Sequence, residues 1–336
     1  MNTLLSIVIP RYRETEKELF PLLSSIHGQV GIDHSVLEVI VATDGKENNP
    51  LEKEFFGLFD FPVTQVTLET NSGPGAARQA GLDAASGKYV MFCDADDTLH
   101  NVGVLQAMTK EADASAADLV SSSWLEEIPD SHGGFVYLEH PKENTWMHGK
   151  LFHRLFLLDN GIQFHDTLRV HEDSYFLSIA ADFAKEHRHM PITSYVWKYH
   201  ADSITRRNKG AYTYESMPEF IRACTLAWNV IEPRHPDRMQ AKVIQFILYQ
   251  YFICHLPNWQ AKEHAHQLRT VEETFAKAIA PFLHYWKSAP RQAVLEAYNT
   301  ERQRSFAGSM EQETLFEWLC RLNIESSQDI PAFQHE

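Results

Sequence analysis

The chain has 336 residues, of which 44% are hydrophobic and 22% are charged, close to the values of an average globular protein. This length suits about two domains, and this composition excludes a disordered chain, a collagen-like repeat and a small disulfide scaffold. The 30 Lys and Arg residues against 45 Asp and Glu residues give a formal net charge of −15, which makes nucleic acid and anionic membrane surfaces poor default partners.

Apolar strands alternate with amphipathic helices along the first 125 residues. In chain order we expect a strand at 4–9, a helix at 14–27, strands at 36–42 and 62–68, a helix at 74–85, a strand at 89–93, a helix at 102–114 and a strand at 119–124. This alternation predicts a Rossmann-like α/β domain, with a mostly parallel sheet and helices on both faces. Ligands of such sheets bind outside the carboxyl ends of the strands.

The pattern changes twice in the rest of the chain. Proline and glycine between 126 and 143 predict a loop or hairpin, and we expect helices at 146–158 and 172–184 and a strand at 192–199 after it. Apolar stripes at helical spacing then continue to the end of the chain. We therefore predict an α/β domain over 1–210 and an α-helical C-terminal domain over 211–336, in which the aromatic residues are mostly core.

The cysteines and the apolar runs bear on the compartment. None of the four cysteines forms a C-x-x-C pair, which excludes a zinc knuckle or thioredoxin motif, and we expect reduced thiols in the cytoplasm. No basic stretch precedes the apolar N-terminal residues, so we predict no signal peptide. The nearest approach to a membrane span, 243–256, is broken by polar residues and falls short of the ~18 residues required, so we expect a buried helix there.

The strongest chemical signal is Asp94-Ala95-Asp96-Asp97, directly after the fourth strand. Unpaired carboxylates at that place would repel one another and be costly beside a core. Asp94 and Asp96 alternate, so both can point toward one divalent cation, which would bind diphosphate oxygens and neutralise a leaving phosphate. Asp also favours turns and helix N-caps, which is the alternative interpretation. The position at the end of a fourth strand favours the metal site.

A second signal is the glycine-rich segment 71–78, which opens the predicted helix at 74–85. Its glycines allow an anion to approach the backbone at a helix N-terminus, and Arg78 can pair with a phosphate or with Asp94. The segment is neither a Walker loop nor G-x-G-x-x-G, so it does not indicate a nucleoside triphosphatase or a nicotinamide enzyme. The alternative is an ordinary helix start.

Two further polar groups follow the first and second strands. Tyr12 can stack on a base, and Asp44 can accept a hydrogen bond from a base N–H. Turn chemistry is the alternative for both positions.

Together these segments resemble family 2 of the nucleotide-sugar glycosyltransferases. The similar segments are 7–12, 38–45, 71–78 and 89–97, in the family's order and spacing, and a looser similarity continues to about residue 207 through 149–152, Glu172-Asp173 and 200–206. The resemblance implies a GT-A fold with a nucleotide-binding half over 1–98 and an acceptor half over 99–210. Arg11 and Arg13 stand where the family usually has Thr and Asn, and Thr43 precedes Asp44 where it usually has Asp.

The resemblance also implies an activity. We expect a metal-dependent inverting transferase, of hexosyl- or N-acetylhexosaminyl type, that moves a sugar from a nucleotide-diphosphate donor such as a UDP-sugar to an acceptor hydroxyl. The expected acceptor is a cell-surface glycan, a teichoic acid or a lipid-linked oligosaccharide. A lipid-linked acceptor would require only peripheral contact at the inner face of the membrane, and the helical domain offers aromatic residues for self-association into a homo-oligomer.

The resemblance assigns roles residue by residue. Asp173 would be the general base, and Asp96 and His200 would bind Mn²⁺ or Mg²⁺. The expected donor-nucleotide contacts are Pro10, Tyr12, Asp44, Arg78, Asp94 and Ala95. The expected phosphate or acceptor contacts are Lys150, Glu172, Ser203, Thr205 and Arg206, with Arg207 beside them.

Two alternative functions are consistent with the same sequence. The fold could act on a protein or a modified nucleic-acid base, with a basic groove lined by Arg11, Arg13, Arg206, Arg207 and Lys209. The altered residues after the first two strands would also suit a degenerate domain that serves as a binding module. The intact Asp94, Asp96, Asp173 and Arg78 count against this second alternative.

Overall fold

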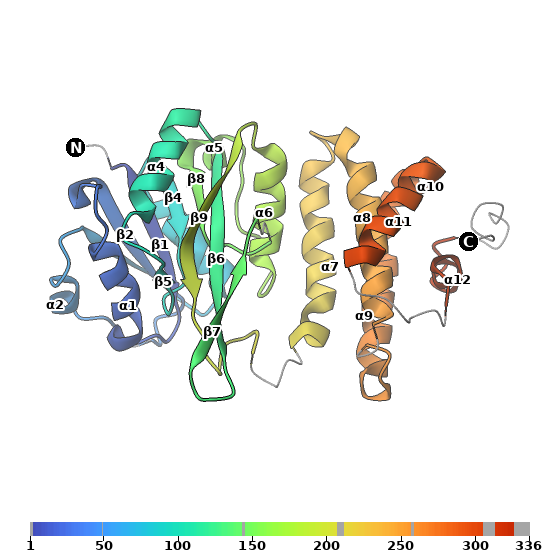
Figure 1. Ribbon diagram of the computed structural model, residues 1–336, viewed down its shortest axis with the longest axis horizontal. Coiled ribbons are helices and arrows are strands. Elements are labelled where there is room, and N and C mark those ends of the chain that lie inside the picture. The colour runs from blue at the N-terminus through green and yellow to red at the C-terminus, as the bar shows by residue number, and fades with distance from the viewer. Residues whose placement is uncertain are drawn as a thin grey trace. The chain divides into compact units, whose positions relative to one another are not determined.

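The computed structural model describes residues 3–48, 50–142, 145–206, 212–256, 259–304 and 313–325. The chain separates into two units, Met1–Ala201 and Asp202–Glu336, each with its own core (Figure 1). Among the described residues, no helix combines the length and the apolarity that crossing a bilayer requires. The described cysteines are all free thiols.

The first unit is built on one curled sheet. Its strands are β1 (Leu5–Arg11), β2 (Leu37–Thr43), β3 (Val63–Thr67), β4 (Tyr89–Phe92), β5 (Thr98–Leu99), β6 (Leu119–Pro129), β7 (Phe135–His140), β8 (Lys150–His153) and β9 (His187–Trp197). The order is β3-β2-β1-β4-β8-β6-β9-β5, with β7 paired to β6. The strands β3, β2, β1 and β4 are parallel, whereas β8 is antiparallel to both of its neighbours. The fold class is confirmed, and the parallel sheet gives way to mixed pairing beyond β4.

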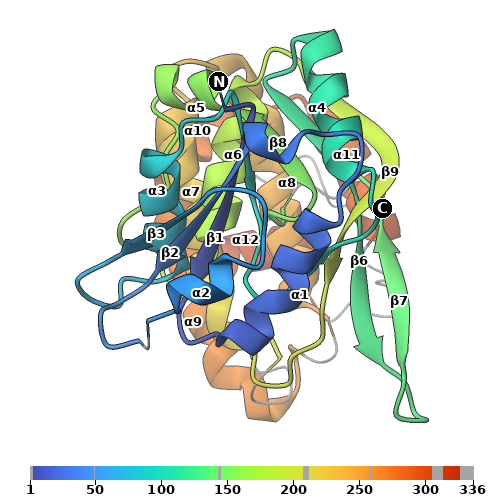
Figure 2. The same ribbon diagram turned by 90° about the vertical axis from the view of Figure 1, so that its left-hand side faces the viewer.

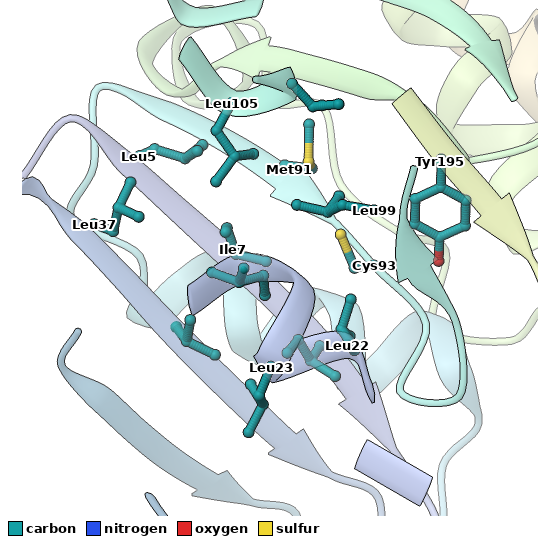
Figure 3. Packing of buried hydrophobic residues seen from close by; sticks show 14 of the residues in the cluster. Leu5, Ile7, Leu22, Leu23, Leu37, Met91, Cys93, Leu99, Leu105 and Tyr195 are labelled. Carbon is teal, nitrogen blue, oxygen red and sulfur yellow. The ribbon is translucent and has the colours of Figure 1, made fainter. Parts of the chain in front are cut away.

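Helices cover both faces of this sheet. They are α1 (Glu16–His27), α2 (Lys53–Phe56), α3 (Pro74–Ala84), α4 (Val104–Ser115), α5 (Arg154–Asp159) and α6 (Glu172–Phe183). Alternate residues of β1 point to opposite faces. Leu5 and Ile7 join the core cluster with Leu22 of α1 and Leu105 of α4 (Figure 3), whereas Val8 faces α3.

The contact between α3 and β1 depends on a glycine. A Cβ built on Gly81 would lie 2.3 Å from Cγ1 of Val8. A side chain at this position would therefore force the helix away from the sheet.

The sequence prediction was wrong in one region. The helix expected at 146–158 is the strand β8 followed by the short helix α5. Leu151 and Phe152 are fully buried between β4 and β6, and Gly149 has a φ of 64° just before the strand. Pairing with two neighbouring strands therefore overrides the local helical pattern.

Other elements agree more closely with the prediction. The segment 126–143 holds the end of β6 and the strand β7, which form the expected hairpin (Figure 2). The strand expected at 192–199 begins earlier, at His187, because it pairs with β6 from Leu119 onward. The two-residue strand β5 was not predicted.

The second unit is helical, as predicted. Its helices include α7 (Tyr212–Ile231), α8 (Pro236–Cys254), α9 (Ala265–Ile279), α10 (Leu283–Lys287), α11 (Arg291–Arg304) and α12 (Leu315–Arg321). Trp228, Phe275 and Trp318 are buried in its core, as expected for aromatic residues at this spacing. Arg321 binds Glu272 and Glu313, which ties α12 to α9.

Candidate active site

The carboxyl ends of the parallel strands bring the predicted residues to one edge of the sheet. Arg11 ends β1 and Thr43 ends β2, and the backbone N–H of Asp44 donates to the carbonyl oxygen of Arg11 at 2.7 Å. Asp94 follows the neighbouring strand β4. This convergence places the chemistry where an open α/β sheet binds its ligands.

Asp44 holds the glycine-rich turn. Its carboxylate is buried and accepts hydrogen bonds from the backbone N–H groups of Ser72 at 2.6 Å and Gly73 at 2.8 Å. Gly73 has a φ of 95°, which favours glycine, and Pro74 begins α3 directly after it. Both carboxylate oxygens of Asp44, the residue predicted to bind the nucleotide base, thus position the start of α3.

Arg78 links α3, the end of β4 and the start of α6. Its guanidinium is buried and donates to Oδ1 of Asp94 at 2.7 Å and to Oε1 of Glu172 at 2.5 Å. Burial opposes its charge, but Asp94 and Glu172 outweigh burial and hold the pKa of Arg78 above its usual range. The pairing with Asp94 was one of the two predicted roles of Arg78. These charge-assisted bonds connect α3, the end of β4 and the start of α6.

A glycine permits this link. A Cβ on Gly75 would lie 2.9 Å from Cγ of Glu172, so the first turn of α3 touches α6. Gly73 therefore shapes the turn, and Gly75 allows α3 and α6 to approach each other.

Asp97 is a structural carboxylate. It is fully buried, accepts from the hydroxyl of Tyr195 at 2.6 Å and from the backbone N–H of Lys198 at 2.8 Å. The same Tyr195 hydroxyl accepts from the backbone N–H of Asp94 at 2.9 Å. Burial, followed by the charge of Asp94, raises the pKa of Asp97 well above its usual range. Tyr195 was missed because a tyrosine within an apolar strand gives no sign of a polar partner.

Asp96, in the acidic loop Asp94–Asp97, lies beside His200, which follows β9, and both side chains are accessible. Their side chains are 32% and 40% exposed, and Oδ2 of Asp96 lies 3.5 Å from Nε2 of His200. Burial and the charge of Asp94 raise the pKa of Asp96 to about 6, while His200 opposes the shift. A bound cation would relieve this repulsion between carboxylates.

The donor atoms fit a divalent metal ion. A carboxylate facing solvent suits Mn²⁺ or Mg²⁺ with water or phosphate oxygens in the other positions, and the imidazole of His200 would add one nitrogen ligand. A second group, Asp94, Asp97 and His148, has its ligand atoms within 4.8 Å of one another. Asp97 and His148 are buried, and burial lowers the pKa of His148 to about 3. Asp96 with His200 is the better fit, because both of these side chains are accessible whereas Asp97 and His148 are buried.

Asp173 is the second residue of α6 and is half-buried. Burial, followed by the charge of Glu172, raises the pKa of Asp173 to about 7, although Arg78 and the backbone N–H of Ser174 lower it. A carboxylate with this pKa is half deprotonated near neutral pH, the range in which a general base works best. Glu172 anchors it, because its bond to Arg78 ties α6 to the acidic loop.

Several predicted residues lie elsewhere or deeper than expected. Lys150 is 1% exposed and its Nζ donates to the carbonyl oxygen of Trp146 at 2.5 Å, so in this structure it does not reach the surface to meet a phosphate or an acceptor. Arg11 is 3% exposed and its Nε donates to the carbonyl oxygen of Glu14 at 2.6 Å, so it does not line the basic groove of the nucleic-acid alternative. Hydrogen bonds to backbone carbonyl oxygens hold both buried cations.

The remaining predicted residues are placed as follows. Pro10 lies within β1, Ala95 is buried in the acidic loop, and the half-buried Tyr12 carries the guanidinium of Arg13 4.6 Å above its ring. Ser203, Thr205 and Arg206 belong to the second unit, and the Ser203 and Thr205 hydroxyls lie 3.2 Å apart. Arg207 and Lys209 lie outside the described residues.

Sequence reasoning also missed an aromatic cluster in the second half of the sheet. The ring of His148 stacks on Tyr195 and Trp197, and Trp146 lies 5.2 Å from Trp197. Trp146 and Trp197 are half-buried, so part of each ring faces solvent. Tryptophans at scattered positions in the sequence give no signal that the fold gathers them.

Known proteins resemble this chain in sequence. The family model Glycosyl transferase family 2 matches residues 6–167. The putative glycosyltransferase EpsH of Bacillus subtilis (strain 168) is 24% identical over 283 residues, covering 76% of this chain and 77% of EpsH. The uncharacterized glycosyltransferase YibD of Escherichia coli (strain K12) is 30% identical over 115 residues, 34% of this chain and 32% of YibD.

A solved structure matches over more of the chain. Residues 1–349 of S. aureus TarS, solved in complex with UDP-GlcNAc, superpose with a TM-score of 0.65 at 19% identity, covering 92% of this chain and 93% of that one. In sequence, the poly(ribitol-phosphate) beta-N-acetylglucosaminyltransferase TarS of Staphylococcus aureus (strain Mu50 / ATCC 700699) is 28% identical over 187 residues, 51% of this chain and 31% of TarS. The chain thus spans about a third of the length of YibD and of TarS, and the structural match confirms the predicted GT-A fold.

Proposed function

Because this chain belongs to glycosyl transferase family 2, we propose that it transfers a sugar from a UDP-sugar to a hydroxyl group, with inversion at the anomeric carbon and Asp173 as the general base. The observation that carries this proposal is the position of Asp173 at the start of α6, a helix that Arg78 ties to the acidic loop through bonds of 2.5 Å to Glu172 and 2.7 Å to Asp94. Within the proposal, residues 1–98 bind the nucleotide and residues 99–210 bind the acceptor.

The step that Asp173 performs is a proton transfer. A sugar hydroxyl is a poor nucleophile, so the Asp173 carboxylate accepts the hydroxyl proton as the acceptor oxygen forms its bond to C1 of the donor. The bond between C1 and the diphosphate oxygen breaks on the opposite face, and UDP leaves with the electron pair. Attack from the face opposite the leaving group inverts the anomeric centre.

The leaving diphosphate gains negative charge as that bond breaks. A divalent cation, when bound, neutralises this charge, and Asp96 and His200 are the residues that would hold it. Arg78 acts indirectly, because its guanidinium is already paired with two carboxylates and fixes the orientation of Asp94 and Glu172.

The donor and acceptor classes follow from the relatives. TarS is named as a beta-N-acetylglucosaminyltransferase and was solved with UDP-GlcNAc, so we propose a UDP-linked hexose or N-acetylhexosamine donor. The name of TarS and that of the succinoglycan biosynthesis protein ExoO support a surface polysaccharide or a teichoic acid as the acceptor. The half-buried rings of Trp146 and Trp197 offer a face on which a sugar can stack.

The test is a donor panel with the whole chain. UDP-GlcNAc, UDP-glucose, UDP-galactose and GDP-mannose are each added with Mn²⁺ or with chelator, and the melting temperature and the release of nucleotide diphosphate are measured. We expect one UDP-sugar to raise the melting temperature only with Mn²⁺, since a ligand of the folded state stabilises it. A well-folded protein that binds no donor would contradict the proposal and support the binding-module alternative.

A further inference from the structure

Two histidines and an aspartate meet at the end of the sheet away from the active site. His27 ends α1, His34 opens the 3-10 turn just before β2, and Asp60 lies in the segment before β3. The active-site carboxylates follow the ends of parallel strands, whereas these three residues precede the starts of two such strands. The cluster, which we call the His27–His34–Asp60 group, is therefore separate from the catalytic edge.

The three side chains converge on one atom. Nδ1 of His27 lies 3.0 Å and Nδ1 of His34 lies 2.6 Å from the same oxygen, Oδ1 of Asp60. One possible ligand atom from each residue lies within 4.8 Å of the other two. The side chains of His27 and Asp60 are 45% and 59% exposed, so an ion can enter from solvent, while that of His34 is only 14% exposed.

The hydrogen bonds of His34 demand a positive charge at its Nδ1. Its other ring nitrogen, Nε2, lies 3.0 Å from the carbonyl oxygen of Gln29. A carbonyl only accepts, so Nε2 carries a proton and donates it. In the neutral ring Nδ1 would then present a lone pair to the Asp60 carboxylate, which is repulsive. At 2.6 Å the contact is a hydrogen bond carried by a proton on Nδ1, and a metal ion bound by both atoms would replace that proton.

We propose that the His27–His34–Asp60 group binds one divalent cation of the zinc class, with water in the remaining position. Two imidazole nitrogens and one carboxylate oxygen form a donor set that suits such an ion. The bond from His34 to Gln29 is the contact that a metal-bound histidine commonly makes through its other nitrogen. The rings of Phe59 and Phe61 lie edge-on to His27, with centroids 6.0 and 6.5 Å away, and hold its orientation.

The ion would have a structural role. It would join α1 to the segments that lead into β2 and β3, because His27 and His34 lie 33 and 26 residues before Asp60 in the chain. Anything that binds the folded state and not the unfolded state stabilises the fold. Zinc should therefore raise the melting temperature of the whole chain without any donor or acceptor present.

The experiment is a titration of metal-free, full-length protein with Zn²⁺ in excess Mg²⁺, which favours the carboxylates of the active site. Calorimetry gives the stoichiometry and a thermal scan gives the shift. The variants are Asp60→Asn and His27→Ala, and His266→Ala, an exposed histidine of the second unit, is the matched control. We expect both cluster variants to bind one zinc fewer than wild type and to lose most of the thermal shift, with His266→Ala unchanged.

Two results would overturn the site. The first is a zinc stoichiometry and thermal shift in Asp60→Asn and His27→Ala equal to those of wild type. The second is a wild-type protein that binds no zinc by calorimetry and whose melting temperature does not change with zinc. Melting temperatures in chelator show whether each variant still folds.

Discussion

Replacing Arg78 by methionine tests the charge network that positions the site. Methionine keeps much of the buried volume and removes the cation, which leaves Asp94 and Glu172 without the partner that lies 2.7 and 2.5 Å away. Removing one member of a buried ion pair costs about 3–5 kcal/mol, because the remaining charge stays desolvated. The Glu172 side chain is only 7% exposed and the Asp94 side chain 31%, so most of the loss should come from Glu172.

The loss in the free energy of unfolding of Arg78→Met should depend on pH in a defined direction. Burial already raises the pKa of Glu172, and Arg78 is the group that lowers it. Without Arg78 the folded state would hold a proton on Glu172 at a pH where the unfolded chain has released it. A folded state that binds more protons loses stability as the pH rises. The deficit of Arg78→Met should therefore be largest near pH 8 and smaller near pH 5.

The assay is urea unfolding of the full-length chain at both pH values, with hydrogen exchange in peptides from β4 and α6 to report on the first unit. The control is Arg188→Met, which removes an exposed cation 2.6 Å from Glu186. Exposed pairs contribute about 0–1 kcal/mol. If Arg78→Met were as stable as the Arg188→Met control at pH 8, the reasoning about the buried network would be refuted.

Three other changes test the site and the fold. Asp173→Asn should lower turnover by about 10²–10⁴-fold while leaving the donor-induced thermal shift intact. Wild-type turnover should fall as the pH drops below about 7, because the base is then protonated. Undiminished turnover in the variant would place the base elsewhere. Asp96→Asn should abolish the Mn²⁺ dependence of donor binding in a thermal-shift assay, and a Mn²⁺ response equal to that of wild type would remove Asp96 from the metal site. Gly81→Ala should lower the free energy of unfolding by about 1–3 kcal/mol, because its Cβ would lie 2.3 Å from Val8. Gly103→Ala, whose Cβ would meet nothing closer than 3.8 Å, is the control for urea unfolding, and equal stabilities would contradict the packing argument.

Local patterns were sufficient for the first half of the sheet. Apolar runs bounded by Pro10, Asp44 and Asp94 mark β1, β2 and β4, because a strand buried on both faces needs apolar residues at successive positions. Once parallel strands are predicted, their carboxyl ends must meet at one edge. The sequence alone therefore determined that the acidic loop, the glycine-rich turn and the second strand end are neighbours.

Tertiary structure decided which of these residues remain accessible. The sequence predicted that Lys150 contacts a phosphate or an acceptor and named Asp97 only as part of the acidic segment, yet both are buried and bonded within the protein. Their burial depends on β8 and β9, which enter the sheet from distant parts of the chain, and β8 was predicted as helix. Hydrophobic periodicity describes a segment's own faces and carries no information about which distant strand will cover them.

The pKa of Asp173 shows the same division between sequence and fold. The sequence placed a carboxylate pair at a helix start, where the helix dipole would favour the ionised form. Only the folded chain buries that helix turn and brings Arg78 to Glu172, so that burial and the Glu172 charge raise the pKa of Asp173 to about 7. Sequence therefore determined which chemical groups are present and along which edge, whereas tertiary packing decided their exposure, their charge state and their partners, because desolvation and Coulomb interactions act through space between residues far apart in the chain.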